Sequence, residues 1–203
     1  STINIGDPKV VFTSKTVVGR ASLISFNAED IVTNGVTSRV KSIEYSIDSS
    51  TYAHFTTAFT LNAGPHVVSY WSLDNVGNME TAKSASITVD DIPPSIVITS
   101  PVGGRFVASR DKVRVNFTVT DNFDPAPSST AYLALLNSTV TVSVATGQEI
   151  HPALIQSGFW TLSVNATDFV ENTESSTTAT FEVVHDTLPP RTALSLNGVS
   201  YCS

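Results

Sequence analysis

Apolar and polar residues alternate along several short stretches of the chain. In residues 113–119, valine or phenylalanine occupies every second position, and residues 43–47 and 160–166 alternate in the same way. A period of two places the apolar side chains on one face of an extended strand. No stretch sustains the period of 3.6 that a helix requires. We therefore predict an all-β fold with no helices of note.

The chain also repeats itself. Two heptapeptides read D-x-x-x-N-x-E, two pentapeptides read F-x-x-x-D, and an aspartate precedes a Pro-Pro pair twice. The repeated blocks are residues 26–30, 74–80 and 91–94 in the first copy and 117–121, 168–174 and 186–190 in the second. Repetition at a nearly constant spacing indicates tandem copies of one structural unit.

The repeats divide the chain into two modules and part of a third. We expect residues 1–91 and 92–186 each to form an antiparallel β-sandwich with Greek-key connections. Residues 187–203 are expected to hold a linker and the first strand of a truncated third repeat. A length of 203 residues suits two domains. The proline pairs should limit the relative orientation of neighbouring modules.

The first repeat resembles a known family of modules. It contains Y-S-x-D at residues 45–48, A-F-T-L at 58–61 and G-x-H-x-V-x-Y-x-S-x-D-x-x-G-N-x-E at 64–80. These motifs are similar to the Ig-like repeat modules of microbial secreted and cell-surface proteins. The second repeat matches more loosely, because it lacks the Y-S-x-D block and has Glu171 in place of the motif's glycine. The resemblance implies non-catalytic modules in tandem and no particular ligand.

The composition of the chain excludes some classes of binding partner. The chain carries 11 basic and 18 acidic residues, for a formal net charge of −7. It would repel a phosphate backbone, so we expect no nucleic-acid partner. Its apolar runs fall short of the ~18 residues of a membrane helix, so no membrane insertion is expected within this segment. The single cysteine, Cys202, excludes a disulfide within the chain, and its role stays open.

Catalytic signatures are missing from the sequence. It contains no G-x-S-x-G, H-E-x-x-H, P-loop or G-x-G-x-x-G motif. The four histidines, at positions 54, 66, 151 and 185, lack the neighbours that a metal site or a catalytic base needs, and we interpret His66 and His185 as structural. We expect no enzymatic activity and no cofactor, apart from calcium.

Acidic residues gather at one expected end of the second sandwich, where the incoming linker and two loops meet. The calcium candidates are Asp90, Asp91, Asp121, Asp124 and Asp168, with Glu171 nearby. Hard oxygen ligands from several loops suit Ca²⁺, which takes about 6–8 of them. Aspartate also caps turns without a metal. In that alternative the Asp side chains accept hydrogen bonds from loop amides, while Gly77 and Asn78 take left-handed conformations.

Three N-x-S/T sequons lie in the second repeat, at Asn116, Asn137 and Asn165. Strand alternation places Asn116 and Asn165 on outward faces, and Asn137 falls in a loop. We therefore predict that all three are accessible, and that at least one carries a glycan if the source organism N-glycosylates.

One apolar strip is expected to face outward in the first repeat. It consists of Val67, Trp71 and Leu73. Such a strip is a candidate contact for a neighbouring module or a sugar ring, whereas a covering loop of the same module is the alternative.

Together these features predict a non-catalytic extracellular segment of a large cell-surface glycoprotein. Its repeats would serve as spacer and contact surface, and its partners would be neighbouring Ig-like repeats, other surface proteins or glycans. The alternative function is a carbohydrate-binding accessory module of a secreted hydrolase.

Overall fold

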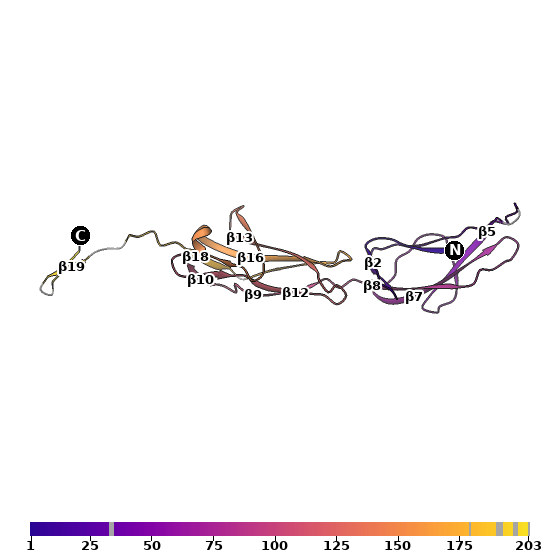
Figure 1. Cartoon of the computed structure of the whole chain (residues 1–203), viewed down its shortest axis with the longest axis horizontal. Coiled ribbons are helices and arrows are strands. Elements are labelled where there is room, and N and C mark those ends of the chain that lie inside the picture. Colours follow the sequence, from indigo (N-terminus) through magenta and orange to yellow (C-terminus); the bar gives the residue numbers. More distant parts are fainter. Residues whose placement is uncertain (33–34, 179, 190–192, 197–198, 203) are drawn as a thin grey trace. The chain divides into compact units, whose positions relative to one another are not determined.

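The computed structural model describes residues 1–32, 35–178, 180–189, 193–196 and 199–202. Apart from one 3-10 turn at Pro152–Leu154, the regular elements of these residues are β-strands, which confirms the all-β class. Figure 1 shows them as arrows coloured along the sequence. Among the described residues, no helix has the length and apolar content needed to cross a membrane.

Two compact, sandwich-like units make up the chain. The first comprises Ser1–Ile96 with the segments Val119–Ser129 and Asn165–Ser175. The second comprises Val97–Thr118, Thr130–Val164 and Ser176–Ser203. The first unit therefore includes two loop segments from the second sequence repeat. The module boundary expected between residues 91 and 92 stays a prediction.

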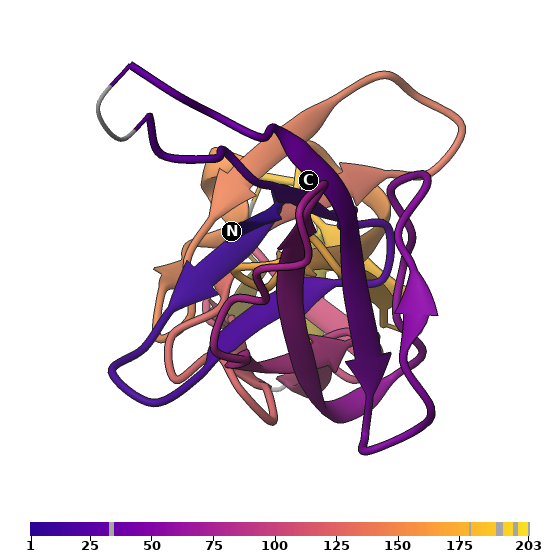
Figure 2. The same cartoon turned by 90° about the vertical axis from the view of Figure 1, so that its right-hand side faces the viewer.

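The first unit contains a six-stranded sheet in the order β2-β3-β8-β7-β5-β6, and β1 pairs with β4 in a second sheet. Its strands are β1 (Thr2–Ile5), β2 (Lys9–Val11), β3 (Thr16–Gly19), β4 (Ile24–Asn27), β5 (Val40–Ile47), β6 (Ala53–His54), β7 (Gly64–Asp74) and β8 (Lys83–Asp90). Figure 2 turns this unit toward the viewer, with the short edge strand β6 beside β5. Most neighbours are antiparallel, but β3 runs parallel to β8.

The core of the first unit is aliphatic and aromatic. Its buried members are Val18, Ile24, Phe26, Leu61, Val68, Tyr70, Ile87 and Val89. Ile43, Tyr45 and Ile47 of β5 pack against this cluster, so the inward phase predicted for residues 43–47 is confirmed. Burial of these side chains is the main source of stability, at about 25 cal/mol per Å² of apolar surface.

A second six-stranded sheet has the order β10-β18-β16-β13-β14, with β17 paired to β16. Its members are β10 (Gly104–Val107), β13 (Ser128–Leu135), β14 (Thr141–Val144), β16 (Gly158–Thr167), β17 (Thr173–Thr177) and β18 (Phe181–Val184). Two further pairs of strands lie outside this sheet: β9 (Ser95–Ser100) with β12 (Asn116–Thr120), and β11 (Val113–Arg114) with β15 (Glu149–Ile150). Here β10 runs parallel to β18, as β3 does to β8. The sequence repeat is thus also a repeat of strand topology.

In strand β16, the side chains that alternation predicts to face inward are buried. Trp160, Leu162, Val164 and Ala166 are all at most 2% exposed. The indole Nε1 of Trp160 donates to the carbonyl oxygen of Gln156 at 2.9 Å, so the buried polar atom is satisfied.

The strand predicted over residues 113–119 is correct in phase but wrong in extent. Val113, Val115 and Phe117 are buried, as expected. The run is nevertheless divided into β11 and β12, because the chain changes its pairing partner at Val115. Strand β11 pairs with β15, whereas β12 pairs with β9.

The C-terminal segment forms an antiparallel pair of strands, β19 (Ala193–Leu196) and β20 (Val199–Cys202). Cys202 is the last residue of β20. Residues 190–192, which include the second proline of the linker, lie outside the described residues. The assignment of residues 187–203 to a third repeat stays a prediction.

Candidate functional site

The repeated D-x-x-x-N-x-E blocks form the same turn after β7 and after β16. In the second copy, Oδ1 of Asp168 accepts from the backbone N–H groups of Val170 at 2.8 Å and Asn172 at 2.9 Å. Its Oδ2 accepts from Nδ2 of Asn172 at 2.9 Å. In the first copy, Asp74 accepts the same three bonds, from the N–H of Val76 and from the N–H and Nδ2 of Asn78.

The backbone of this turn differs in one respect from the sequence-based expectation. Gly77 is left-handed, with φ at 95°, and Glu171 occupies the equivalent place at 70°. Asn78 was expected to be left-handed as well, and that expectation is wrong. The N–H and side-chain amide of Asn78 are instead directed at Asp74.

Asp90, the last residue of β8, is almost completely buried, with 1% of its surface exposed. Its Oδ1 accepts from the N–H of Ile92 at 3.1 Å, and one end of the side-chain amide of Asn122 lies 3.4 Å from it. Its Oδ2 has no hydrogen-bond partner among the described residues. Burial raises the pKa of Asp90, and the charges of Asp121 and Asp168 raise it further.

Asp90, Asp121 and Asp168 come together within the first unit. One carboxylate oxygen from each lies within 4.8 Å of those from the other two. Oδ1 of Asp121 accepts from the N–H groups of Phe123 and Asp124, both at 2.8 Å. These backbone bonds orient the carboxylate from the loop that follows β12. We call these three residues the aspartate cluster.

Two of the five calcium candidates lie outside the aspartate cluster. Asp91 faces Arg20, with 3.9 Å between a carboxylate oxygen and a guanidinium nitrogen. Asp124 is buried and accepts from the N–H of Ala126 at 2.9 Å, which is the turn-capping role. Glu171 is exposed. Of the five calcium candidates, three therefore cluster, one caps a turn and one faces an arginine.

Close packing holds the loop of Asp168 against residues 1–96 of the same unit. Nδ2 of Asn172 donates to the backbone oxygen of Asp90 at 3.1 Å. The rings of Phe12 and Phe169 meet edge to face, with centroids 6.2 Å apart. At Gly19, a Cβ atom would lie only 2.9 Å from the carbonyl oxygen of Val170. A side chain at Gly19 would therefore push this loop away.

The charge of the aspartate cluster is not balanced by a basic side chain. None of the ion pairs found among the described residues includes Asp90, Asp121 or Asp168. All of its potential ligand atoms are oxygens, since it contains neither histidine nor cysteine. The arrangement can hold a hard cation, because such ions prefer carboxylate and carbonyl ligands.

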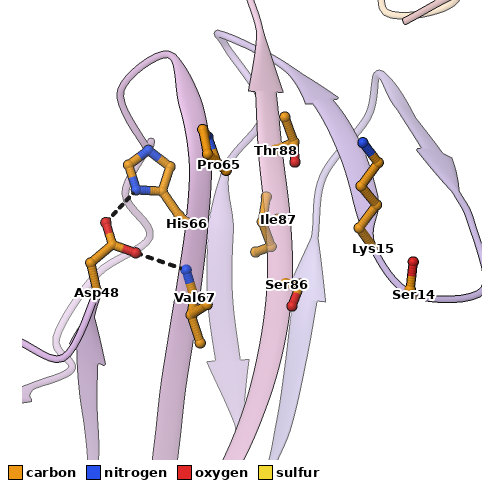
Figure 3. Close-up of a pocket in the computed structure, with 9 residues that line it drawn as sticks. All are labelled: Ser14, Lys15, Asp48, Pro65, His66, Val67, Ser86, Ile87 and Thr88. Atoms are coloured by element: carbon orange, nitrogen blue, oxygen red, sulfur yellow. Dashed lines mark hydrogen bonds and ion pairs between the residues drawn. The ribbon is translucent and has the colours of Figure 1, made fainter.

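An open surface hollow of about 400 Å³ lies over β7 and β8 of the first unit. Figure 3 shows His66 and Asp48 on one side of it and Lys15 on the other. Nδ1 of His66 lies 2.7 Å from Oδ2 of Asp48, whose Oδ1 accepts from the N–H of Val67 at 2.8 Å. This network was not inferred from the sequence, although both side chains belong to the motifs quoted above.

The three sequon asparagines are exposed. Asn116 begins β12, and Asn165 lies near the end of β16. Asn137 lies between β13 and β14 with a left-handed φ of 57°. Each side chain is therefore open to solvent, which is the first requirement for modification.

The strip of Val67, Trp71 and Leu73 is only partly open. Val67 is 47% exposed. Trp71 and Leu73 are half-buried. The ring of Tyr52 packs on Trp71, with centroids 5.9 Å apart. Tyr52 precedes β6, so a segment of the same unit covers part of the strip.

The chain matches no protein-family model and no curated protein. Among solved structures, it is similar to the fibronectin(III)-like modules of Clostridium thermocellum CbhA, with 12% identity and a TM-score of 0.44. That match covers 91% of this chain and 95% of the other. The chain is also similar, with lower TM-scores, to two protocadherin structures, and it spans about half the length of each.

The first, a protocadherin gammaB7 EC3-6 cis-dimer, shows 13% identity over 92% of this chain and 49% of the other, with a TM-score of 0.35. The second, protocadherin Gamma B2 extracellular cadherin domains 3-6, shows 13% identity over 98% and 52%, with a TM-score of 0.33. The likeness concerns β-sandwich architecture alone.

Proposed function

We propose that this chain is a non-catalytic, extracellular segment of repeated β-sandwich modules that acts as spacer and contact surface in a larger cell-surface protein. The proposed modules are residues 1–91 and 92–186, followed by the linker and the start of a third in 187–203. Exposed sequons on the second repeat agree with an extracellular location. The proposed partners are neighbouring repeats of the same chain, other surface proteins and glycans.

The observation that supports this proposal is the pair of parallel strands present in each repeat. Strand β3, near the start of the first repeat, runs parallel to its last strand, β8. Tension on the two ends of the repeat pulls these strands in opposite directions along their shared axis. Their hydrogen bonds are then loaded in shear and must break together, rather than one at a time. The pair β10 and β18 repeats the arrangement.

Single-molecule stretching of the full chain tests the spacer role. We expect two separate unfolding steps, and each should lengthen the chain by at most about 300 Å, the extended length of roughly 90 residues. Thr16→Pro, in β3, should lower the force of one step only, since β10 and β18 are untouched. Ala53→Pro, in the short edge strand β6, is the matched control and should leave both forces unchanged. A single step, or extension without resistance, contradicts the proposal.

A second candidate function, carbohydrate binding, rests on the aromatic pair of Tyr52 and Trp71. Tyr52 is 46% exposed, so its ring is available to stack on a sugar. Binding of the chain to a panel of polysaccharides, abolished by Tyr52→Ala in a protein of unchanged melting temperature, would favour this function. Failure to bind any of them would leave the spacer role as the only candidate.

A further inference from the structure

We propose that the aspartate cluster, Asp90, Asp121 and Asp168, binds a hard divalent cation, Ca²⁺ in preference to Mg²⁺, with Asn122 as a further oxygen donor. The site lies within the first unit and is independent of the spacer role proposed above.

Asp90 buries a carboxylate oxygen that has no partner among the described residues. Burying an ionised carboxylate is costly unless hydrogen bonds or an opposite charge compensate. Oδ1 of Asp90 accepts from the N–H of Ile92, but Oδ2 has no partner among the described residues. Buried polar atoms are rarely left in this state. A cation held between Asp90 and the other two carboxylates would supply the missing partner.

The other two carboxylates are held in place by backbone groups. Both N–H donors to Asp121 bind its Oδ1, and no backbone bond to its Oδ2 is found among the described residues. Asp168 is fixed by the N–H groups of Val170 and Asn172. Asn172 also joins this loop to Asp90 by donating to the backbone oxygen of that residue. The cluster is therefore assembled before a ligand arrives, which lowers the entropic cost of binding.

Asn122 is placed to respond to the cation. Its side-chain amide has one end 3.1 Å and 3.3 Å from the two carboxylate oxygens of Asp121. With its nitrogen at that end, the amide donates to both oxygens and partly offsets their charge. With its oxygen there, three acceptors face one another, an arrangement that is favourable only around a cation. Cation binding is thus expected to rotate this amide.

The donor set selects the kind of cation. Carboxylate and amide oxygens suit hard ions, and the absence of histidine and cysteine from the cluster disfavours zinc and copper. Three carboxylates from three separate segments form an irregular shell. Ca²⁺ tolerates such geometry and takes about 6–8 ligands, with water completing the shell. Mg²⁺ demands a near-ideal octahedron and gives up its water reluctantly.

Thermal unfolding of the full chain with CaCl₂, with MgCl₂ and with a chelator tests this proposal. We expect millimolar CaCl₂ to raise the melting temperature of the first unit, which contains the aspartate cluster, by several degrees. The chelator should reverse the shift, and MgCl₂ should produce a smaller one. Calorimetric titration should show one saturable site per chain. Coincident melting curves and no heat of binding at about 10 mM CaCl₂ would overturn the proposal.

Two matched variants locate the site. Asp90→Asn keeps the shape of the side chain and removes its charge, so it should abolish the calcium-induced shift. It should not lower the melting temperature in chelator, because it relieves repulsion within the cluster. Asp74→Asn alters the equivalent turn of the other repeat, which lies outside the cluster, and should retain the full shift. A calcium response kept by Asp90→Asn, or lost in Asp74→Asn, would show that the cation binds elsewhere.

Discussion

His66 and Asp48, 18 residues apart in the sequence, are joined by a hydrogen bond of 2.7 Å between Nδ1 and Oδ2. Nε2 of His66 lies 2.9 Å from the carbonyl oxygen of Asn62. A carboxylate and a carbonyl oxygen only accept, so both ring nitrogens donate and the imidazolium form is favoured. The bond to Asp48 raises the pKa of His66, and the bonds from Val67 and His66 lower the pKa of Asp48.

These opposite pKa shifts predict a pH-dependent contribution to stability. A raised pKa for His66 means that its contribution is complete below about pH 6.5, the unfolded value, and disappears as the pH rises through the folded pKa. The contribution of Asp48 is lost instead as the pH falls below its usual value of 3.8. His66→Gln should therefore reduce the melting temperature more at pH 5 than at pH 9.

The control for this prediction is the same substitution in an Asp48→Asn background. Without the carboxylate the imidazolium loses its main partner, so the effect of His66→Gln should become similar at the two pH values. Thermal unfolding followed by circular dichroism measures all four proteins. An effect of His66→Gln that is the same at pH 5 and pH 9 in the wild-type background would contradict the predicted coupling.

Leu162 and Leu154 provide a matched pair for the core around β16. Leu162 is fully buried, whereas Leu154, in the 3-10 turn, is 81% exposed. Leu162→Ala should lower the free energy of unfolding by about 3 kcal/mol, because it removes buried methyl groups and leaves a cavity. Leu154→Ala should change it by less than about 0.5 kcal/mol. Urea denaturation of both variants checks this, and equal losses would argue against the assigned core.

The strand faces were predictable because side chains in a strand alternate strictly between two sides. Trp160, Leu162 and Val164 obey that rule on a strand whose other face is polar from Thr161 onward. A change of pairing partner along a strand does not alter the alternation of apolar and polar residues in the sequence. The division of residues 113–119 into β11 and β12 depends on which strands lie beside them, and alternation is unchanged across the division.

The candidate site was predictable only in part. Repetition of the D-x-x-x-N-x-E block predicted the turn that contains Asp168. The expected meeting of the linker and two loops at one end of the sandwich predicted that other aspartates lie near it. The sequence did not show which of Asp90 and Asp91 belongs to the aspartate cluster, because buried and exposed residues no longer alternate at the end of β8. Residues 87–90 are all buried, and β8 is an inner strand that pairs with β3 on one side and β7 on the other. The position of Asn122 beside the cluster also required the structure.

The sequons support a prediction about modification. In a host that N-glycosylates, peptide mass spectrometry after enzymatic deglycosylation should find a mark on Asn116, Asn137 or Asn165. Asn137 should carry the highest occupancy, because it lies between strands rather than in a hydrogen-bonded ladder. Ser138→Ala changes the residue between Asn137 and Thr139 and should preserve the sequon, whereas Thr139→Ala should remove it. Three unmodified sites would refute the prediction.

Gly77 and Glu171 occupy the same place in the two repeated turns, and both are left-handed. This conformation costs a residue with a Cβ atom about 1 kcal/mol but is freely available to glycine. A Cβ atom at Gly77 would meet nothing within 4 Å, so Gly77→Ala should lower the free energy of unfolding through backbone strain alone, by about 1 kcal/mol.

Glu171→Gly should raise the free energy of unfolding by a few tenths of a kcal/mol, since the greater freedom of glycine in the unfolded chain offsets part of the gain. Glu171→Ala is the control that retains the strain, and it should resemble wild type. Urea denaturation in the presence of chelator measures the three variants, and an Ala variant of Glu171 as stable as the Gly variant would show that the side chain, rather than the backbone, sets the energy of this turn.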